Sequence, residues 1–129
     1  MSDSSAVDVG LAASATYTVA ESDTARWLGS GDLEVLATPR LLAWMEAVTC
    51  RALERALTPG RTSVGKRIGL EHLQASPCGT KVEVVARVTH VEGRELRLEA
   101  VATMGDRVCG RAEITRVVVD RDRFMERLT

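Results

Sequence analysis

The pattern of apolar and polar positions separates this chain into one long helix and a set of strands. Residues 38–53 contain its densest apolar run, built mainly from leucine, alanine, valine and methionine, which are mostly good helix formers. Thr38 is a plausible N-cap, Pro39 falls at the first helical position, and the Thr-Pro-Gly sequence at residues 58–60 is a stop signal. The pattern predicts a helix over residues 39–57. Since apolar side chains lie nearly all round it, we expect that helix to be buried.

Most of the remaining chain alternates apolar and polar residues with a period of two, which predicts β-strands. The strands are expected at residues 15–19, 63–74, 81–90, 96–102 and 107–119. Residues 20–37 contain two glycines and are expected to form a flexible connection with a short helical turn. Gly93 and Gly105 mark hairpin turns between the last three strands, and Asp120 is a candidate cap for a short helix at residues 121–128.

The order of these elements defines the expected fold class. A strand, a long apolar helix and four antiparallel strands fit an α+β domain in which one sheet face buries the helix. A curved antiparallel sheet wrapped around one long buried helix is the hotdog fold, and we expect it over residues 9–129 as a single domain. The polar residues 1–8 are expected to be a disordered tail. Pairing of edge strands from two copies would remove exposed edges, so the expected assembly is a homodimer.

Composition limits the possible partners and the compartment. The 129 residues are 45% apolar and 27% charged, and the net charge is −1, which argues against binding of nucleic acid through phosphate neutralisation. Two Trp, one Tyr and one Phe are too few for a base-stacking platform. No apolar run approaches the roughly 18 residues of a membrane span, and the first residues lack a basic-then-apolar signal pattern. We therefore expect a cytoplasmic protein with neither a nucleic-acid nor a membrane partner.

The cysteines and histidines bear on the redox compartment and on metal binding. Cys50, Cys78 and Cys109 are odd in number and widely separated, which fits a reducing cytosol better than a disulfide framework. Cys50 and Cys109 fall in apolar runs and are expected in the core. With two histidines and no CxxC or HxxxH spacing, the sequence indicates no metal site, and nothing in it implies a cofactor.

Glu46 is the first candidate for chemistry because it lies in the middle of the apolar helix. An unpaired buried carboxylate is costly, so such a group is neutral, paired or functional. Arg40 or Arg51 is a possible partner, and a surface position would also explain a lone glutamate. On its position alone, Glu46 is therefore open to a structural or a functional interpretation.

Several short motifs occur along the chain at spacings that resemble those of a known family. They are Ala37-Thr38 at the helix start, Met45-Glu46 within the helix, Ser63-Val64-Gly65 and His72 on the next strand, and Gly110-Arg111-Ala112-Glu113-Ile114-Thr115-Arg116 on the last. Over roughly residues 10–125 the chain resembles the fluoroacetyl-CoA thioesterase-like hotdog proteins. The resemblance implies that Thr38, Glu46 and His72 form a catalytic triad. It implies that Gly65 and Arg116 are substrate-binding positions that support the triad.

The residue types of this implied site suit thioester hydrolysis. Glu46 is a candidate nucleophile or general base for water, and His72 is a candidate donor to the thioester or the departing thiolate. Thr38 offers a hydroxyl that can orient Glu46 or a water, and Gly65 allows a close backbone approach. Thr38 and Glu46 lie about 12 Å apart along the helix axis, so we expect a dimer partner to complete the site.

Each of the other implied site residues also has a structural interpretation. Thr38 would serve as a helix cap, and His72 as a hydrogen-bonded packing residue. Gly65 would mark a β-bulge. Arg116 would be a surface arginine, although its charge also suits the phosphates of coenzyme A.

The sequence departs from the family in the segment before Thr38. Fluoroacetyl-CoA-specific members carry phenylalanines there that form a hydrophobic lid, whereas residues 27–37 contain none and Phe124 is the only phenylalanine of the chain. We therefore expect a hydrolase of acyl-CoA or acyl-carrier-protein thioesters without fluoroacetate specificity. The alternatives are a hotdog protein that binds an acyl thioester or a related small ligand without hydrolysis, and a structural or partner-binding dimer.

Overall fold

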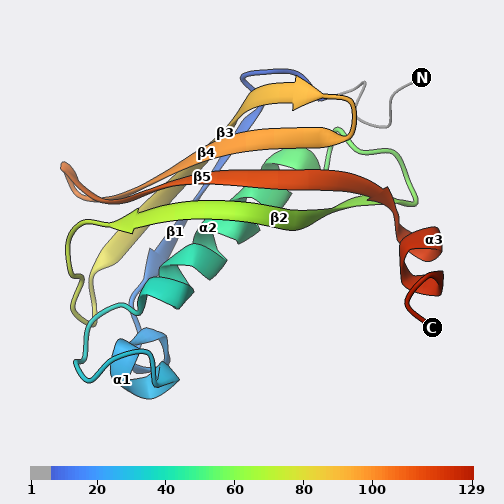
Figure 1. Cartoon of the computed structure of the whole chain (residues 1–129). Helices are drawn as coiled ribbons and strands as arrows, with labels where there is room; N and C mark the ends of the chain where they lie inside the picture. Colours follow the sequence, from blue (N-terminus) through green and yellow to red (C-terminus); the bar gives the residue numbers. More distant parts are fainter. Residues whose placement is uncertain (1–6) are drawn as a thin grey trace.

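The computed structural model describes residues 7–129 as one curved five-stranded sheet with a long helix against it (Figure 1). All strand pairs are antiparallel, and the strand order across the sheet is β1-β3-β4-β5-β2. The strands are β1 (Ala12–Thr18), β2 (Arg61–His72), β3 (Lys81–Glu92), β4 (Glu95–Met104) and β5 (Arg107–Asp120). The helices are the 3₁₀ turn η1 (Glu21–Asp23), α1 (Ala25–Leu28), α2 (Thr38–Leu53) and α3 (Arg121–Glu126). The expected α+β architecture is confirmed.

Helix α2 begins and ends earlier than the sequence predicts. Its N-cap is Ala37, which makes no side-chain capping bond, so the expected capping by Thr38 is wrong. Thr38 is the first helical residue, and its hydroxyl has a partner elsewhere. The helix ends at Leu53, where a tight turn follows because the amides of Ala56 and Leu57 both donate to the Leu53 carbonyl.

The apolar face of the sheet packs on α2. The residues of β3 predicted to share one face are fully buried: Val82, Val84, Ala86 and Val88. Facing them, α2 buries these apolar side chains: Leu41, Trp44, Met45, Val48, Ala52 and Leu53. Tyr17 of β1 stacks on Trp44 with ring centroids 4.6 Å apart. This packing holds α2 against the sheet and therefore fixes where its polar residues point.

Both predicted hairpins are present and keep the last three strands in register. Residues 93–94 join β3 to β4, and residues 105–106 join β4 to β5. Gly93 and Gly105 each have a φ of 59°, a conformation that glycine adopts without steric cost. Two-residue turns with such a glycine are typical of tight antiparallel hairpins.

One face of α2 is not covered by the sheet. Ala43, Ala47 and Cys50 are exposed, and their spacing of four and three residues places them on one side of the helix. The prediction that α2 is buried all round is therefore wrong for a single chain, because the sheet reaches only one side of it. Cys50 was expected in the core and is exposed, whereas Cys109 on β5 is buried as expected.

Hydrogen bonds order the segment between β1 and α2. Thr24 caps α1 by accepting from the Trp27 amide at 3.2 Å. The Ala25 amide donates to the Val35 carbonyl at 2.8 Å, so the segment folds back on itself. The short helical turn expected here is present and ends at Gly29, which has a φ of 76°. In place of the expected flexible connection, the segment is a compact, hydrogen-bonded loop.

The edges and ends of the fold complete the description. Strands β1 and β2 form the two edges of the sheet, and α3 follows β5 and projects beyond it (Figure 1). Val7, part of the expected tail, is 4% exposed and belongs to the cluster around Leu53 and Val88. Residues 1–6 of that tail lie outside the described residues, and Asp8 is exposed. Among residues 7–129, no helix has both the length and the apolar character needed to cross a membrane.

Candidate active site

Glu46 lies half-buried on α2 with its carboxylate against an arginine from β5. Nη1 of Arg116 donates to Oε2 of Glu46 at 3.2 Å. The arginine side chain is 7% exposed and the glutamate side chain 34%. Arg116 is held in turn by Ser63 of β2, because its Nε donates to Oγ at 2.8 Å and its Nη2 to the carbonyl oxygen at 3.1 Å. A guanidinium with all three nitrogens engaged therefore fixes one oxygen of Glu46.

Sequence reasoning missed this pairing of Glu46 with Arg116. Arg40, one of the partners considered, pairs instead with Asp23 at 3.1 Å. The alternation of β5 contained the signal, because Ile114, Arg116 and Val118 are all buried on one face. Because Arg116 alternates along β5 with the same period as core residues, its side chain points inward, and its buried charge needs an acidic partner. Glu46 is the acid that the fold brings to it.

The β2 backbone approaches the Glu46 carboxylate so closely that a side chain would collide with it. A Cβ at Gly65 would lie 2.6 Å from Oε2 of Glu46. Gly65 pairs with Arg116 across the sheet, and the register shifts between Gly65 and Arg67. The structure therefore agrees with both interpretations of Gly65. The residue stands at a β-bulge, and its lack of a side chain permits the β2 backbone to approach Glu46 closely.

A second polar group lies at the N-terminal end of α2. The Thr38 hydroxyl and Nδ1 of His72 are 2.7 Å apart. Thr38 belongs to the first turn of α2 and His72 ends β2, so the contact joins the helix start to the sheet edge. When the hydroxyl donates to Nδ1, the imidazole proton resides on Nε2 and that nitrogen becomes a donor.

His72 is held in the neutral state, in which one ring nitrogen donates a hydrogen bond and the other accepts one. Burial lowers the pKa of His72 below its ordinary value of 6.5, and hydrogen bonding to the Gln74 backbone partly offsets this. The neutral imidazole is therefore favoured at neutral pH. Nε2 is buried and has no well-aligned hydrogen-bond partner among residues 7–129. A buried nitrogen of this kind is costly unless a group from outside the described chain bonds to it.

The two polar groups do not join within one chain. Thr38 and Glu46 are separated by about 12 Å along the axis of α2. Gly65 and His72 are separated by roughly 23 Å along extended β2. None of the hydrogen bonds between described residues links the two groups. The structure thus brings Thr38 to His72, and separately brings Glu46 to Arg116 and Gly65.

A cavity of about 260 Å³ opens beside Thr38 and His72. The segment before α2 and the residues after β2 form its other walls. These lining residues are Ala25, Ser30, Val35, Leu36, Leu73, Gln74 and Ala75. Most of them are small or aliphatic, so the cavity offers an apolar space next to a hydroxyl and an imidazole.

The two groups together supply the functions that acyl-transfer chemistry needs. Glu46 supplies a positioned carboxylate. His72 supplies a neutral imidazole whose Nε2 has no hydrogen-bond partner among the described residues. Within the described part of the chain, no gathering of three or more His, Cys, Asp or Glu side chains could hold a metal ion.

Comparison with solved structures defines the class of protein to which this arrangement belongs. A crystal structure of a hot-dog-like protein from Thermanaerovibrio acidaminovorans matches with a TM-score of 0.90 and 26% identity, over 99% of this chain and 95% of that one. A variant of the fluoroacetyl-CoA-specific thioesterase FlK, crystallised with fluoroacetate and CoA, matches with a TM-score of 0.85 and 31% identity, over 92% and 99% of the two chains. The fold is that of the hotdog thioesterases.

The family follows from the sequence matches. The model of the family described as fluoroacetyl-CoA-specific thioesterase matches residues 19–122. The fluoroacetyl-CoA thioesterase of Streptantibioticus cattleyicolor is 35% identical over 91 residues, which are 70% of this chain and 66% of that protein. The chain belongs to this thioesterase family. The family, the hotdog fold and the thioesterase class predicted from the sequence are confirmed.

Proposed function

We propose that this chain hydrolyses an acyl thioester of coenzyme A or of an acyl carrier protein, with Glu46 as the reacting carboxylate. The observation that carries the proposal is the placement of Glu46, whose Oε2 is bonded to Arg116 while Oε1 has no hydrogen-bond partner among the described residues. A fixed carboxylate with a free oxygen can attack the thioester carbonyl to give a mixed anhydride and a thiolate. It can equally take a proton from an attacking water. The FlK structures with CoA and with acetyl-CoA support this substrate class.

In this proposal His72 and Thr38 stabilise the charge that develops during hydrolysis. Nε2 of His72 donates a hydrogen bond to the developing oxyanion or to the departing thiolate. Thr38 bonds to Nδ1, which orients the ring and leaves the proton on Nε2. Arg116 and Gly65 set the position of the Glu46 carboxylate. They support substrate binding by holding that carboxylate where it meets the thioester. The proposed location is the cytoplasm, which agrees with the three free cysteines.

The test of this assignment is Glu46→Gln, which removes the charge and keeps the shape. We expect kcat/KM for acyl-CoA to fall at least about 100-fold in a protein that still folds, with a lower melting temperature because Arg116 loses its negative partner. The matched control is Glu113→Gln on β5, where the glutamate is exposed and lies outside the site. Hydrolysis at the wild-type rate by Glu46→Gln, over short, branched, aromatic and long acyl-CoAs, would remove Glu46 from the mechanism.

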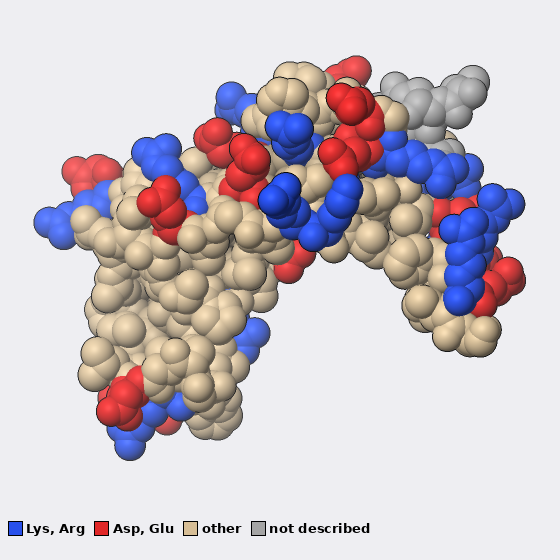
Figure 2. All heavy atoms as spheres, in the orientation of Figure 1, with Lys and Arg blue, Asp and Glu red and all other residues tan. Residues whose placement is uncertain are grey.

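We propose further that two copies of the chain complete each site. Strand β2 is an edge strand, and the face of α2 that carries Ala43, Ala47 and Cys50 is uncovered. Antiparallel pairing of two β2 edges would place the end that carries His72 beside the half of the other strand that carries Gly65. Figure 2 shows the molecule hollowed on this side, between its main body and α3. The separation of the two polar groups within one chain also favours a shared site.

Mixing two inactive variants tests the shared site. Glu46→Gln and His72→Gln are each expected to be inactive, and a mixed dimer would contain one intact site out of two. Because half of the randomly formed dimers are mixed, refolding the two variants together should recover about a quarter of the wild-type activity. Light scattering would measure whether the refolded protein forms the proposed dimer. A refolded mixture that stays as inactive as its components would place the whole site in one chain.

We propose that the cavity beside Thr38 and His72 receives the acyl group. At about 260 Å³, it has more room than a two-carbon acyl group fills, since each group the size of a water occupies only about 30 Å³. The segment before α2 contributes Ala25, Ser30, Val35 and Leu36 to its wall, and residues 27–37 contain no phenylalanine. A roomy cavity separates substrates that differ by one small substituent by only about 1–3 kcal/mol.

Acyl specificity is tested by kcat/KM for fluoroacetyl-CoA and acetyl-CoA beside a medium-chain and an aromatic acyl-CoA. We expect no strong preference between the two-carbon substrates and a higher value for one of the larger ones. A preference above about 1,000-fold for fluoroacetyl-CoA would show that another segment closes the cavity.

A further inference from the structure

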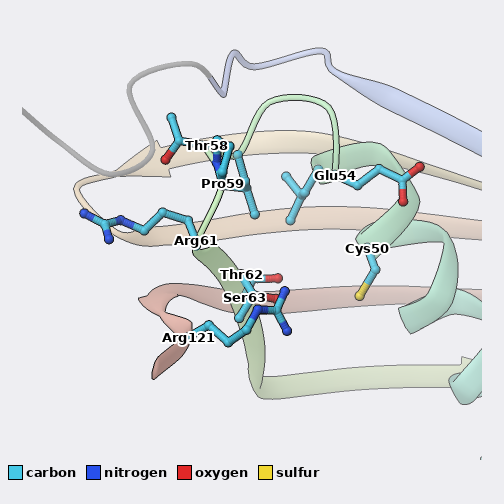
Figure 3. Close-up of a pocket in the computed structure, with 11 residues that line it drawn as sticks. Cys50, Glu54, Thr58, Pro59, Arg61, Thr62, Ser63 and Arg121 are labelled. Carbon is cyan, nitrogen blue, oxygen red and sulfur yellow. The ribbon is translucent and has the colours of Figure 1, made fainter. Parts of the chain in front are cut away.

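A second cavity, of about 490 Å³, lies at the C-terminal end of α2, where the chain turns into β2 (Figure 3). Cys50 lines it from the last turn of α2, Glu54 from the C-cap of that helix, and Thr62 and Ser63 from the start of β2. Arg121, the first residue of α3, adds a third wall. Three separate elements therefore shape a pocket that the hydrolytic mechanism does not use.

This cavity adjoins the Glu46 group through Ser63. Ser63 lines the cavity and also holds Arg116 by two hydrogen bonds, at 2.8 and 3.1 Å. On α2, Cys50 stands one turn beyond Glu46 and Glu54 two turns beyond it, about 6 and 12 Å along the axis. The cavity thus leads away from the proposed reacting carboxylate toward the end of the helix.

Arg121 supplies positive charge at the far end of this path. Its guanidinium is turned toward Thr62 and Ser63, into the cavity (Figure 3). Among the described residues the side chain of Arg121 has no hydrogen bond or ion pair, while its amide donates to the Gly60 carbonyl at 2.9 Å. The backbone is therefore fixed while the guanidinium keeps all of its donors for a ligand.

The neighbouring charges leave Arg121 as the cation that a ligand would meet. Arg61 also lines the cavity but pairs with Asp120 at 2.8 Å. Glu54 is the one carboxylate in its wall, on the opposite side. Figure 2 shows Lys and Arg atoms gathered along α3, with Asp and Glu atoms beside them. Glu54 and Arg121 stand on opposite sides of the cavity (Figure 3), so an anionic group bound at Arg121 would not lie against the carboxylate.

We propose that this cavity holds the pantetheine arm of the substrate and that Arg121 binds a phosphate at the end of that arm. The phosphate belongs to coenzyme A or to the phosphopantetheine group of a carrier protein. This inference rests on the proposed hydrolysis at Glu46. In both substrates the pantetheine arm separates the thioester from the nearest phosphate, so a phosphate site must lie well away from the reacting carboxylate. Arginine suits such a site because its planar fork of donors matches phosphate oxygens.

The experiment compares three thioesters with one acyl group, carried by coenzyme A, by phosphopantetheine and by pantetheine without phosphate. For Arg121→Gln we expect KM for acyl-CoA to rise about fivefold to tenfold with kcat nearly unchanged. KM for the acyl-pantetheine, which has no phosphate, should not change. Arg121→Lys keeps the charge and should recover part of the loss. Arg127→Gln, the matched control, removes the same charge near the end of α3 but lies outside the cavity.

The three substrates also separate the sources of the phosphate. An equal loss with acyl-phosphopantetheine and acyl-CoA assigns Arg121 to the phosphate next to the arm. A loss confined to acyl-CoA assigns it to the phosphates of the nucleotide. An unchanged KM for acyl-CoA, or an equal rise with acyl-pantetheine, overturns the proposal. If the wild-type protein hydrolyses none of the three, it is the proposed function that fails.

Discussion

Replacing Gly65 by alanine tests how the β2 backbone sets the position of the Glu46 carboxylate. The new Cβ would lie 2.6 Å from Oε2 of Glu46 and 3.6 Å from Nη1 of Arg116. Gly65 does not have a positive φ, so alanine can keep the same backbone and the methyl group is the whole perturbation. The end of a half-exposed glutamate side chain yields more readily than two paired strands, so we expect the carboxylate to move.

The size of that movement follows from the contact distances. Ordinary contact begins at 3.4 Å, so Oε2 must retreat by about 0.8 Å. This shift strains or breaks its 3.2 Å bond to Arg116. A displacement near 1 Å can cost about 100-fold in rate, so kcat/KM should fall about 10- to 100-fold. Stability should fall by no more than about 2 kcal/mol, the scale of one hydrogen bond to a charged group.

The assay is kcat/KM with an acyl-CoA substrate beside a thermal melt. Gly69→Ala is the matched control, since Gly69 lies on the same strand and a Cβ there meets nothing within 4 Å. We expect wild-type kinetics from this control and a folded, slow enzyme from Gly65→Ala. Wild-type kinetics from Gly65→Ala would refute the reasoning that this glycine places Glu46. Loss of the fold would show that the backbone gives way before the side chain.

Two further predictions concern the core and the histidine. In Gly110→Ala the new Cβ would lie 2.8 Å from Cδ2 of Leu41, so we expect a loss of about 1–3 kcal/mol in the free energy of unfolding; an unchanged denaturation midpoint would contradict it. In the variant His90→Gln, His72 is the only remaining histidine. Burial should hold the pKa of His72 below 6.5. An NMR titration measures that pKa, and a midpoint above 6.5 would count against burial as the cause. Because the folded pKa is the lower one, the stability that His72 contributes is present above 6.5 and is lost as the pH falls through the folded value.

The elements of the fold could be predicted because their signals are local and agree with one another. The apolar run at residues 38–53 indicated α2, and the alternation of Val82, Val84 and Ala86 indicated a strand with one buried face. Gly93 and Gly105 marked both hairpins, because a two-residue turn needs a positive φ at that position. With one long helix and five strands in this order, few architectures bury the apolar face of the sheet.

The ends of α2 and the conformation of the loop before it could not be predicted from local signals in the same way. Thr38 has the chemistry of an N-cap, but its hydroxyl bonds to His72, which lies 34 residues away in the sequence. Ala37 takes the capping position without a side-chain bond. Two glycines in residues 20–37 favoured flexibility, whereas the amide of Ala25 finds a partner in Val35. In each case a partner outside the local sequence decided between two locally acceptable conformations.

For the site, the sequence by itself determined the chemical character of each side chain, and the tertiary structure decided what each one meets. An acid in an apolar helix pointed to Glu46, but its partner Arg116 lies 70 residues further along the chain. The apolar run around Cys50 likewise favoured a core position, but it could not show that no strand covers this residue. Periodicity describes one element at a time, while a contact depends on how two elements pack. The Glu46–Arg116 pair and the open face of α2 therefore emerge only when the sheet closes over one side of the helix.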